Sequence, residues 1–168
     1  AFADLVEAYK GPVFRLAFRM TGSARDADDL SQEIFIRAFQ SLARFRPGER
    51  FFPWLYTMGL NVIRNHLRKG KAVPEDGDAK DAADPRENPA DAAVGRERSR
   101  RIQGYLLRLP PAVREILVLR FYEGMSFEDI AGLTGDSLSG AKMKAYRGLE
   151  KIRVMMDEDG FLDDESGG

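Results

Sequence analysis

Apolar residues recur three or four positions apart along most of the chain, which is the spacing of one face of an α-helix. The pattern covers the segments 2–20, 24–45, 51–70, 96–109, 111–124, 126–135 and 137–153. The alternation of apolar and polar residues that is typical of β-strands is not found. The sequence therefore predicts an all-α fold.

The first three segments predict the helices of an N-terminal domain. Gly11 and Pro12 interrupt the first segment, and we expect them to bend or divide that helix. In the second segment the predicted inward-facing residues are Leu30, Ile34, Phe35, Ala38, Phe39 and Leu42. Pro53 opens the third helix, because proline suits the first helical turn. The predicted core face of this helix comprises Leu55, Met58, Val62, Ile63 and Leu67.

Residues 70–95 break the periodicity. They contain seven acids, three bases and three prolines, and such a segment cannot bury enough apolar surface to fold alone. A helix resumes at Arg96, with Ile102, Tyr105, Leu106 and Leu109 on its apolar side. The predicted organisation is a helical domain over 1–70, a flexible acidic linker over 71–95, a second helical domain over 96–156 and an acidic tail over 157–168, which we expect to be disordered.

The composition excludes several classes of chemistry. The formal net charge is −1, there is no cysteine, and there is one histidine, so disulfides, thiolate zinc sites and a cysteine nucleophile are ruled out. No nucleophile–base pair, metal cluster or phosphate-binding loop is found, so we expect neither an enzyme nor a bound cofactor or metal. No apolar run has membrane-spanning length and no secretory signal is found, so we expect a cytoplasmic protein without membrane insertion.

The C-terminal segments predict a helix-turn-helix. Ser126 is a good N-cap, Ala131 permits close helix packing, and Gly135 permits a left-handed turn residue. Asp136 or Ser137 then caps a second helix, whose predicted inward residues are Leu138, Ala141, Ala145, Leu149 and Ile152. The other face of this helix carries Lys142, Lys144, Arg147, Lys151 and Arg153. A helical hairpin with a solvated basic face is the alternative, but the turn chemistry together with the one-sided charge favours DNA binding.

A supporting helix precedes this motif. Pro111 suits its first position and Gly124 ends it. Its predicted buried residues are Val113, Ile116, Leu117, Leu119 and Phe121.

Two features of the N-terminal domain allow a structural and a functional interpretation. Acids crowd the first half of the helix over 24–45; from the residues alone, complementarity to the helix dipole is the favoured explanation, and an acidic docking surface for a basic partner is the alternative. At the start of the helix over 51–70 the aromatic residues are Phe51, Phe52, Trp54 and Tyr56, and the polar residues that follow are Asn61, Arg64, Asn65, Arg68 and Lys69. Rings beside cations and amides suit single-stranded nucleic acid, although such rings can also be core.

Three motifs resemble bacterial sigma factors. The stretch LPPAVREILVLRFYEGMSFEDIAGLTG, followed by a basic helix, resembles their C-terminal DNA-binding region, and helix-turn-helix regulators share much of it. DADDLSQEIFIRAF resembles the region that docks on the clamp helices of RNA polymerase, and FRPGERFFPWLYTMGLNVIRNHLRK resembles the region that recognises and melts the −10 element. The plan of two domains without an intermediate one resembles the extracytoplasmic-function (ECF) group. Asn65 and Ser139–Gly140 depart from the usual family residues, which leaves the promoter sequence open.

The resemblance implies a sigma factor that directs RNA polymerase to promoters and helps to open them, with core polymerase, promoter DNA and an anti-sigma factor as partners. The residues implied in core binding are Asp29, Gln32 and Glu33. Those implied at the −10 element are Arg46, Arg50, Phe52, Trp54, Tyr56, Asn61, Arg64, Asn65 and Arg68. Those implied at the −35 element are Ser137, Ser139, Lys142, Met143, Lys144, Tyr146 and Arg147, with Lys144 and Lys151 on phosphate.

Two other hypotheses compete with this one. A free-standing helix-turn-helix regulator explains 126–153 but gives the acidic helix and the aromatic cluster no role. A sigma-like decoy that only binds an anti-sigma protein could lose its DNA-facing cations, whereas this chain retains Lys142, Lys144 and Arg147.

Overall fold

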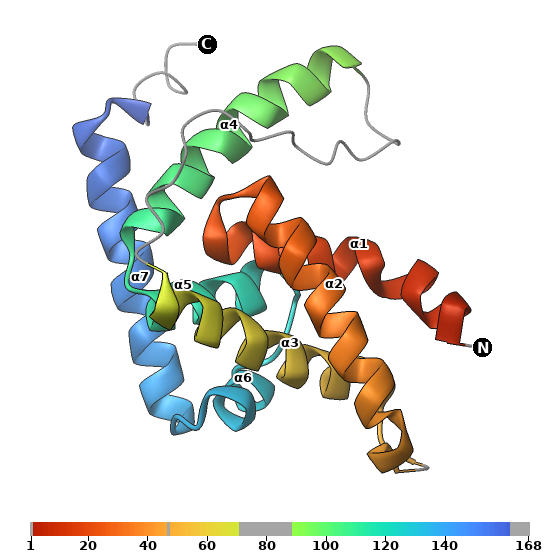
Figure 1. Cartoon of the computed structure of the whole chain (residues 1–168). Coiled ribbons are helices and arrows are strands. Elements are labelled where there is room, and N and C mark those ends of the chain that lie inside the picture. Colours follow the sequence, from red (N-terminus) through yellow and green to blue (C-terminus); the bar gives the residue numbers. More distant parts are fainter. Residues whose placement is uncertain (1, 47, 71–88, 162–168) are drawn as a thin grey trace. The chain divides into compact units, whose positions relative to one another are not determined.

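The computed structural model describes residues 2–46, 48–70 and 89–161, and within them the fold is all-α, as predicted, without a strand. The elements are α1 (Phe2–Thr21), α2 (Ala24–Ser41), a 3₁₀ turn η1 (Leu42–Arg44), α3 (Phe51–Lys69), α4 (Pro89–Arg108), α5 (Pro111–Leu117), a π-helical turn η2 (Val118–Tyr122), α6 (Phe127–Thr134) and α7 (Leu138–Glu158), shown in Figure 1. The chain divides into two compact units, Ala1–Arg96 and Glu97–Gly168. Each unit is described by itself.

Unit 1 is formed by α1, α2 and α3, which pack on one another. Its core residues include Leu16, Ala17, Met20, Ala27, Leu30, Ile34, Leu55, Leu60 and Ile63. Gly59 faces Ile34, and a Cβ on Gly59 would lie 3.5 Å from the Ile34 Cδ1 atom. Gly11 and Pro12 were predicted to bend or divide the first helix; they do not divide it, because α1 runs through Pro12 without interruption. The buried residues of α1 all follow Pro12, from Val13 to Thr21, and their packing offsets the one backbone hydrogen bond that proline cannot donate.

The start of α2 agrees with the sequence, but its end does not. The Ser23 hydroxyl accepts a hydrogen bond from the Asp26 amide at 3.1 Å and caps the helix. The helix ends at Ser41 and continues only as η1, short of the predicted Phe45. Phe39, predicted to face inward, is 62% exposed and meets the Phe2 ring edge-on. Helical spacing places Phe39 at the border of the apolar face, where the packing of neighbouring helices decides exposure.

Unit 2 packs α5 and α6 against α7. Its core includes Ile116, Leu117, Val118, Leu119 and Ile130. On α7 the buried positions are Ala141, Ala145, Gly148 and Ile152. The predictions that Leu138 and Leu149 face inward are wrong, because Leu138 is 41% exposed and Leu149 is 38% exposed. The small residues instead let α5 approach closely, since a Cβ on Gly148 would lie 2.6 Å from the Val113 Cγ1 atom.

A π-helical turn changes the register after α5. The Glu123 amide donates to the Val118 carbonyl, five residues back, at 3.1 Å. This turn holds one residue more than an α-helical turn, so the positions after Val118 rotate relative to the α-helical pattern. Phe121, predicted to be buried, is therefore 57% exposed. Gly124 has a φ of +67° and ends the turn, as predicted.

The connection between α4 and α5 contains a buried arginine. Arg114 is 6% exposed, and its guanidinium donates to the carbonyls of Leu106, Leu107 and Leu109 at 2.9–3.0 Å. These carbonyls lie at the end of α4, where the helix itself provides no donors. Burial lowers the pKa of Arg114.

Helix α4 begins at Pro89 rather than at the predicted Arg96. The predicted linker residues 71–88 lie outside the described residues.

The start of the predicted disordered tail is folded. Phe161 is 6% exposed, and the Arg101 guanidinium lies 4.5 Å from the centre of its ring. The Tyr105 hydroxyl donates to Asp159 at 2.9 Å. Burial and this hydrogen bond raise the pKa of Tyr105. The prediction of disorder is therefore wrong for 157–161, and 162–168 lie outside the described residues.

Candidate nucleic-acid interface

The aromatic residues at the start of α3 form a connected ring cluster, which comprises Tyr9, Phe45, Phe51, Phe52, Trp54 and Tyr56. Centroid distances within it range from 4.4 Å for Phe52–Tyr56 to 5.8 Å for Phe45–Phe51. Phe52 and Trp54 are half-buried, whereas Tyr56 is 2% exposed. A ring must present a free face to stack on a base. Tyr56 presents none, so we withdraw it from the predicted −10 residues.

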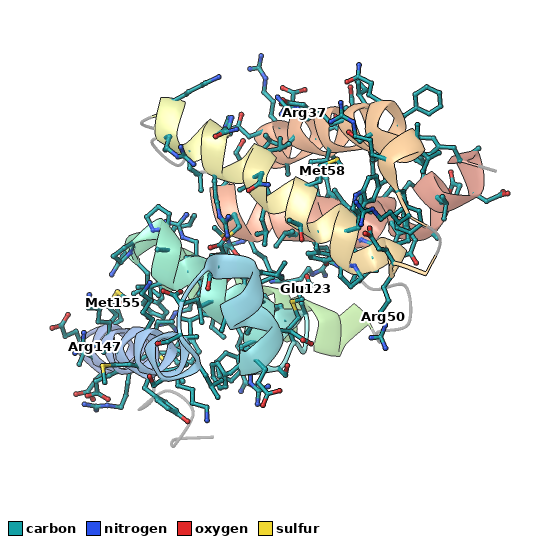
Figure 2. The ribbon with its side chains drawn as sticks, turned by 90° about the horizontal axis from the view of Figure 1, so that it is seen from below. Arg37, Arg50, Met58, Glu123, Arg147 and Met155 are labelled. Carbon is teal, nitrogen blue, oxygen red and sulfur yellow. The ribbon has the colours of Figure 1, made fainter. Side chains whose placement is uncertain are left out.

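Polar residues border this cluster at both ends. Arg46 and Arg50 are exposed in the loop before α3, and their guanidinium groups have no partner among the described residues. Figure 2 shows the Arg50 side chain extending away from the ribbon at the start of α3. Asn61, Asn65 and Arg68 are exposed farther along α3, and Arg64 is half-buried. The loop and helix thus present cations, half-buried rings and amides on one connected segment.

Beside these amides, a hollow of about 300 Å³ lies between α2 and α3. It is lined by Glu33, Arg37, Val62, Asn65, His66, Lys69 and Gly70. The His66 Nε2 atom lies 3.5 Å from an Asp26 carboxylate oxygen. Within the described residues, no group of three or more His, Asp and Glu side chains is placed to hold a metal ion.

The predicted core-binding residues lie on the exposed face of α2. Asp29, Gln32 and Glu33 are all exposed. Glu33 forms an ion pair with Arg37 at 2.9 Å, and Gln32 donates to Asp28 at 3.3 Å. Asp29 makes no hydrogen bond or ion pair in the described part of the chain. The face is acidic at Asp29 and partly neutralised one turn later.

In unit 2, α6 and α7 form the predicted helix-turn-helix. The Ser126 hydroxyl accepts from the Asp129 amide at 3.1 Å and caps α6. Gly135 has a φ of +78° and ends that helix in the left-handed conformation. The Ser137 hydroxyl accepts from the Gly140 amide at 3.0 Å, which identifies Ser137 as the cap of α7.

Asp136, between these helices, has a role that the sequence analysis did not assign. Its carboxylate accepts hydrogen bonds from the Thr134 hydroxyl at 2.8 Å and from the Lys144 ammonium at 2.7 Å. We call these three residues the turn clasp. The hydrogen bond from Lys144 is the main cause that lowers the pKa of Asp136; burial opposes it, and the hydrogen bond from Thr134 and the charge of Lys144 add to the lowering. The clasp links the end of α6 to the second turn of α7. The pairing of an acid in the turn with a lysine in the following helix was the available sequence signal.

In the first half of α7, the exposed residues on the side away from its buried stripe include Ser139, Lys142, Met143, Tyr146 and Arg147, which we call the exposed stripe. Figure 2 shows Arg147 projecting outward from α7. Lys142 and Arg147 have no hydrogen bond or ion pair within the described residues. Lys144 is instead committed to Asp136, and Arg153 to Glu150 at 2.7 Å. Of the cations predicted to make this helix basic on one side, Lys142 and Arg147 are therefore the ones in its N-terminal half that have no partner among the described residues.

None of the described helices combines the length and the apolar composition that crossing a membrane requires.

Comparisons with known proteins agree with this division into two units. The family model "Sigma-70 region 2" matches residues 5–73, and "Sigma-70, region 4" matches residues 99–152. The RNA polymerase sigma factor CarQ of Myxococcus xanthus is 36% identical over 158 residues, which cover 94% of this chain and 90% of CarQ. The ECF sigma factor SigE of Mycolicibacterium smegmatis is 35% identical over 89% of this chain, which spans only 59% of SigE.

A solved structure has a similar fold. The structure of CnrH in complex with the cytosolic domain of CnrY matches with a TM-score of 0.67 and 26% identity. The match covers 94% of this chain and 88% of the CnrH chain.

Proposed function

Because the chain belongs to the ECF group of the sigma-70 family of RNA polymerase sigma factors, we propose that it directs RNA polymerase to specific promoters and assists their opening. One observation carries the proposal. The two family regions lie on two separate folded units, and each unit exposes side chains that suit one task. On this proposal the chain works in the cytoplasm with the polymerase and performs no chemistry of its own.

Unit 2 would recognise the −35 element through α7. An α-helix fits the major groove, and the residues of its outward face reach the base edges. Ser139, Lys142, Met143, Tyr146 and Arg147 make up that face, and Ser137 lies at its start. Lys144 is half-buried and paired with Asp136, so we reassign it from phosphate binding to holding the turn. Lys151 is exposed and retains its predicted role as a phosphate contact.

Unit 1 would hold the melted strand of the −10 element. Unstacking a duplex costs a few kcal/mol per step or flipped base. A protein without ATP chemistry can meet that cost only by binding the open strand better than the duplex. Stacking on an accessible ring contributes about 1–3 kcal/mol per base, and cations beside it neutralise phosphate. The half-buried rings of Phe52 and Trp54, the exposed Arg46 and Arg50, and the amides of Asn61 and Asn65 supply these parts.

The acidic face of α2 would dock on a basic helical element of core polymerase. Asp29 has no hydrogen bond or ion pair with any residue that the structure describes, so its full charge is available for association. Glu33 already pairs with Arg37, and a partner must compete with that ion pair. Charge reversal of both acids should slow association and weaken the complex, more strongly at low salt.

We also propose that an anti-sigma factor controls the chain. The support is the similarity to CnrH, whose structure was solved in a complex with the cytosolic domain of CnrY.

Run-off transcription with purified core polymerase over a promoter library tests the proposed function. Transcripts should start from a defined subset of promoters only when this chain is added. The Asp29→Arg/Glu33→Arg variant, checked for folding, should lose most of this activity because it binds core polymerase weakly. A chain that shifts duplex promoter DNA tightly alone, and leaves the transcripts unchanged, would instead be a free-standing regulator.

A further inference from the structure

We propose that Met143 and Tyr146, the apolar centre of the exposed stripe on α7, recognise the methyl groups of thymines in the upstream promoter element. This inference rests on the proposed function and names the bases that the same surface reads. It starts from an anomaly in the exposed stripe. Met143 is 53% exposed and Tyr146 is 62% exposed, on a helix whose buried positions are filled by smaller residues.

The two side chains lie next to each other and on the correct side of the helix. Residues three positions apart are neighbours on a helix surface. The buried stripe of Ala141, Ala145 and Gly148 occupies the opposite side, so neither side chain belongs to the buried core of unit 2. Lys142 precedes the pair and Arg147 follows it, and both cations are uncommitted among the described residues. The surface is therefore apolar in the middle and cationic at both ends.

Tyr146 also contacts an aromatic ring of α6. Its ring lies 6.5 Å from that of Phe127, and the Arg120 guanidinium lies 4.7 Å from the centre of the Phe127 ring. Arg120 in turn donates to the Met125 carbonyl at 3.0 Å. These contacts position Phe127, and Phe127 in turn limits the positions open to the Tyr146 ring on one side. A restricted side chain loses less conformational entropy on binding, which favours a recognition role over a freely solvated ring.

Among the groups that bases present in the major groove, the thymine methyl group matches the apolar pair best. The thymine C5 methyl is the one apolar group that standard base pairs present there, whereas guanine presents two acceptors and cytosine a donor. Lys142 and Arg147 can donate to guanine or to phosphate. Glu150, the nearest acid on α7, is paired with Arg153, and a cytosine amino group would have to compete with that ion pair. Residues 142 and 147 are about 7.5 Å apart along the helix axis, which is about two base-pair steps. We therefore expect one or two T·A pairs directly beside a guanine.

The test uses the full chain bound to core polymerase. A promoter is first selected from a randomised duplex library with the wild-type holoenzyme. Each thymine of its upstream element is then replaced singly by deoxyuridine, which removes the methyl group and leaves the hydrogen-bonding edge intact. Removal should weaken closed-complex formation by about fourfold at one or two positions. Met143→Gln and Tyr146→Gln should each lose this sensitivity. Val154 lies on the same face of α7, about 16 Å from Met143 along the helix axis, so Val154→Gln should retain the sensitivity to deoxyuridine.

The outcomes separate this inference from the function on which it rests. Failure of the holoenzyme to select any promoter would contradict the proposed function itself. A selected promoter that tolerates deoxyuridine at every upstream thymine would overturn the methyl recognition alone. Sensitivity that persists unchanged in both Gln variants would also overturn it, because other residues would then contact the methyl groups.

Discussion

The two proposed DNA surfaces differ in whether their residues also pack the interior of the protein. In unit 1 the rings at the start of α3 belong to the ring cluster that packs α1 against α3, and Tyr56 is fully engaged in it. In unit 2 the exposed stripe and the buried stripe occupy opposite sides of α7. Substitutions in the exposed stripe should therefore report function, whereas substitutions in the ring cluster change folding as well.

The largest predicted effect is on the ring cluster. Tyr56→Ala should lower the free energy of unfolding of unit 1 by about 3–5 kcal/mol, because it removes a buried aromatic ring and leaves a cavity. The same substitution at the exposed Tyr146 should lower that of unit 2 by less than about 1 kcal/mol. Trp54 is the only tryptophan, so its fluorescence during urea unfolding reports unit 1, and circular dichroism followed in parallel also reports the helices of unit 2. Equal losses in the two variants would remove the contrast between the surfaces.

A smaller effect is expected at the contact between α5 and α7. Gly148→Ala places a Cβ 2.6 Å from Val113 and 2.9 Å from Leu117, and such overpacking costs about 1–3 kcal/mol. The better helix propensity of alanine offsets up to about 1 kcal/mol of this. In the control Gly132→Ala, the Cβ meets open space in α6, and this variant should be slightly stabilised. Circular dichroism measures both, and destabilisation of the control instead would contradict the packing described here.

The smallest effect concerns the turn clasp and depends on pH. Lys144 holds the pKa of Asp136 below its ordinary value in the folded chain. The resulting stabilisation is complete above the unfolded-state pKa, near 3.9, and is lost as the pH falls through the lower, folded-state pKa. Asp136→Asn should cost about 0.5–1 kcal/mol at pH 7, because Lys144 is partly solvated. The difference in unfolding free energy from the wild type should shrink below pH 4. A difference that is constant from pH 7 to pH 3 would show that the ion pair contributes nothing.

Features that are decided by residues close together in the sequence were predicted better than features that are decided by distant contacts. The cap at Ser126 and the left-handed Gly135 were predicted correctly, and Ser137 is one of the two caps predicted for α7, because a few neighbouring residues decide these features. Helical periodicity located α1 to α3 and α5 to α7 for the same reason. The start of α4 was placed too late, because alanine-rich sequence between polar residues gives no amphipathic signal.

The errors occur where distant contacts decide. Phe121 and Leu138 are apolar at helical spacing, yet a π-turn and the start of a helix leave them exposed. Phe161 stands in an acidic tail and is buried because α4 offers Arg101 and Tyr105 as partners. Within the candidate interface, the sequence placed the exposed stripe correctly on the surface. It could not show that Tyr56 is buried, since this depends on tertiary contacts, and the pairing of Lys144 with Asp136, eight residues earlier, was missed.

The central claim is that unit 2 binds the promoter while unit 1 opens it, and one comparison tests it directly. Holoenzymes carrying Arg46→Ala/Arg50→Ala/Asn61→Ala in unit 1 or Lys142→Ala/Arg147→Ala in unit 2 are assembled on the same promoter. All five positions are exposed, so both variants should fold. Closed complexes are measured by gel shift, and unpaired thymines by permanganate reactivity.

The account predicts that the unit 1 variant forms closed complexes at nearly wild-type affinity but loses permanganate reactivity at the −10 element. The unit 2 variant should lose affinity in the closed complex, by about 1–3 kcal/mol for each cation that reads a base. Wild-type strand opening by the unit 1 variant, together with wild-type closed complexes of the unit 2 variant, would contradict the division of tasks between the two units.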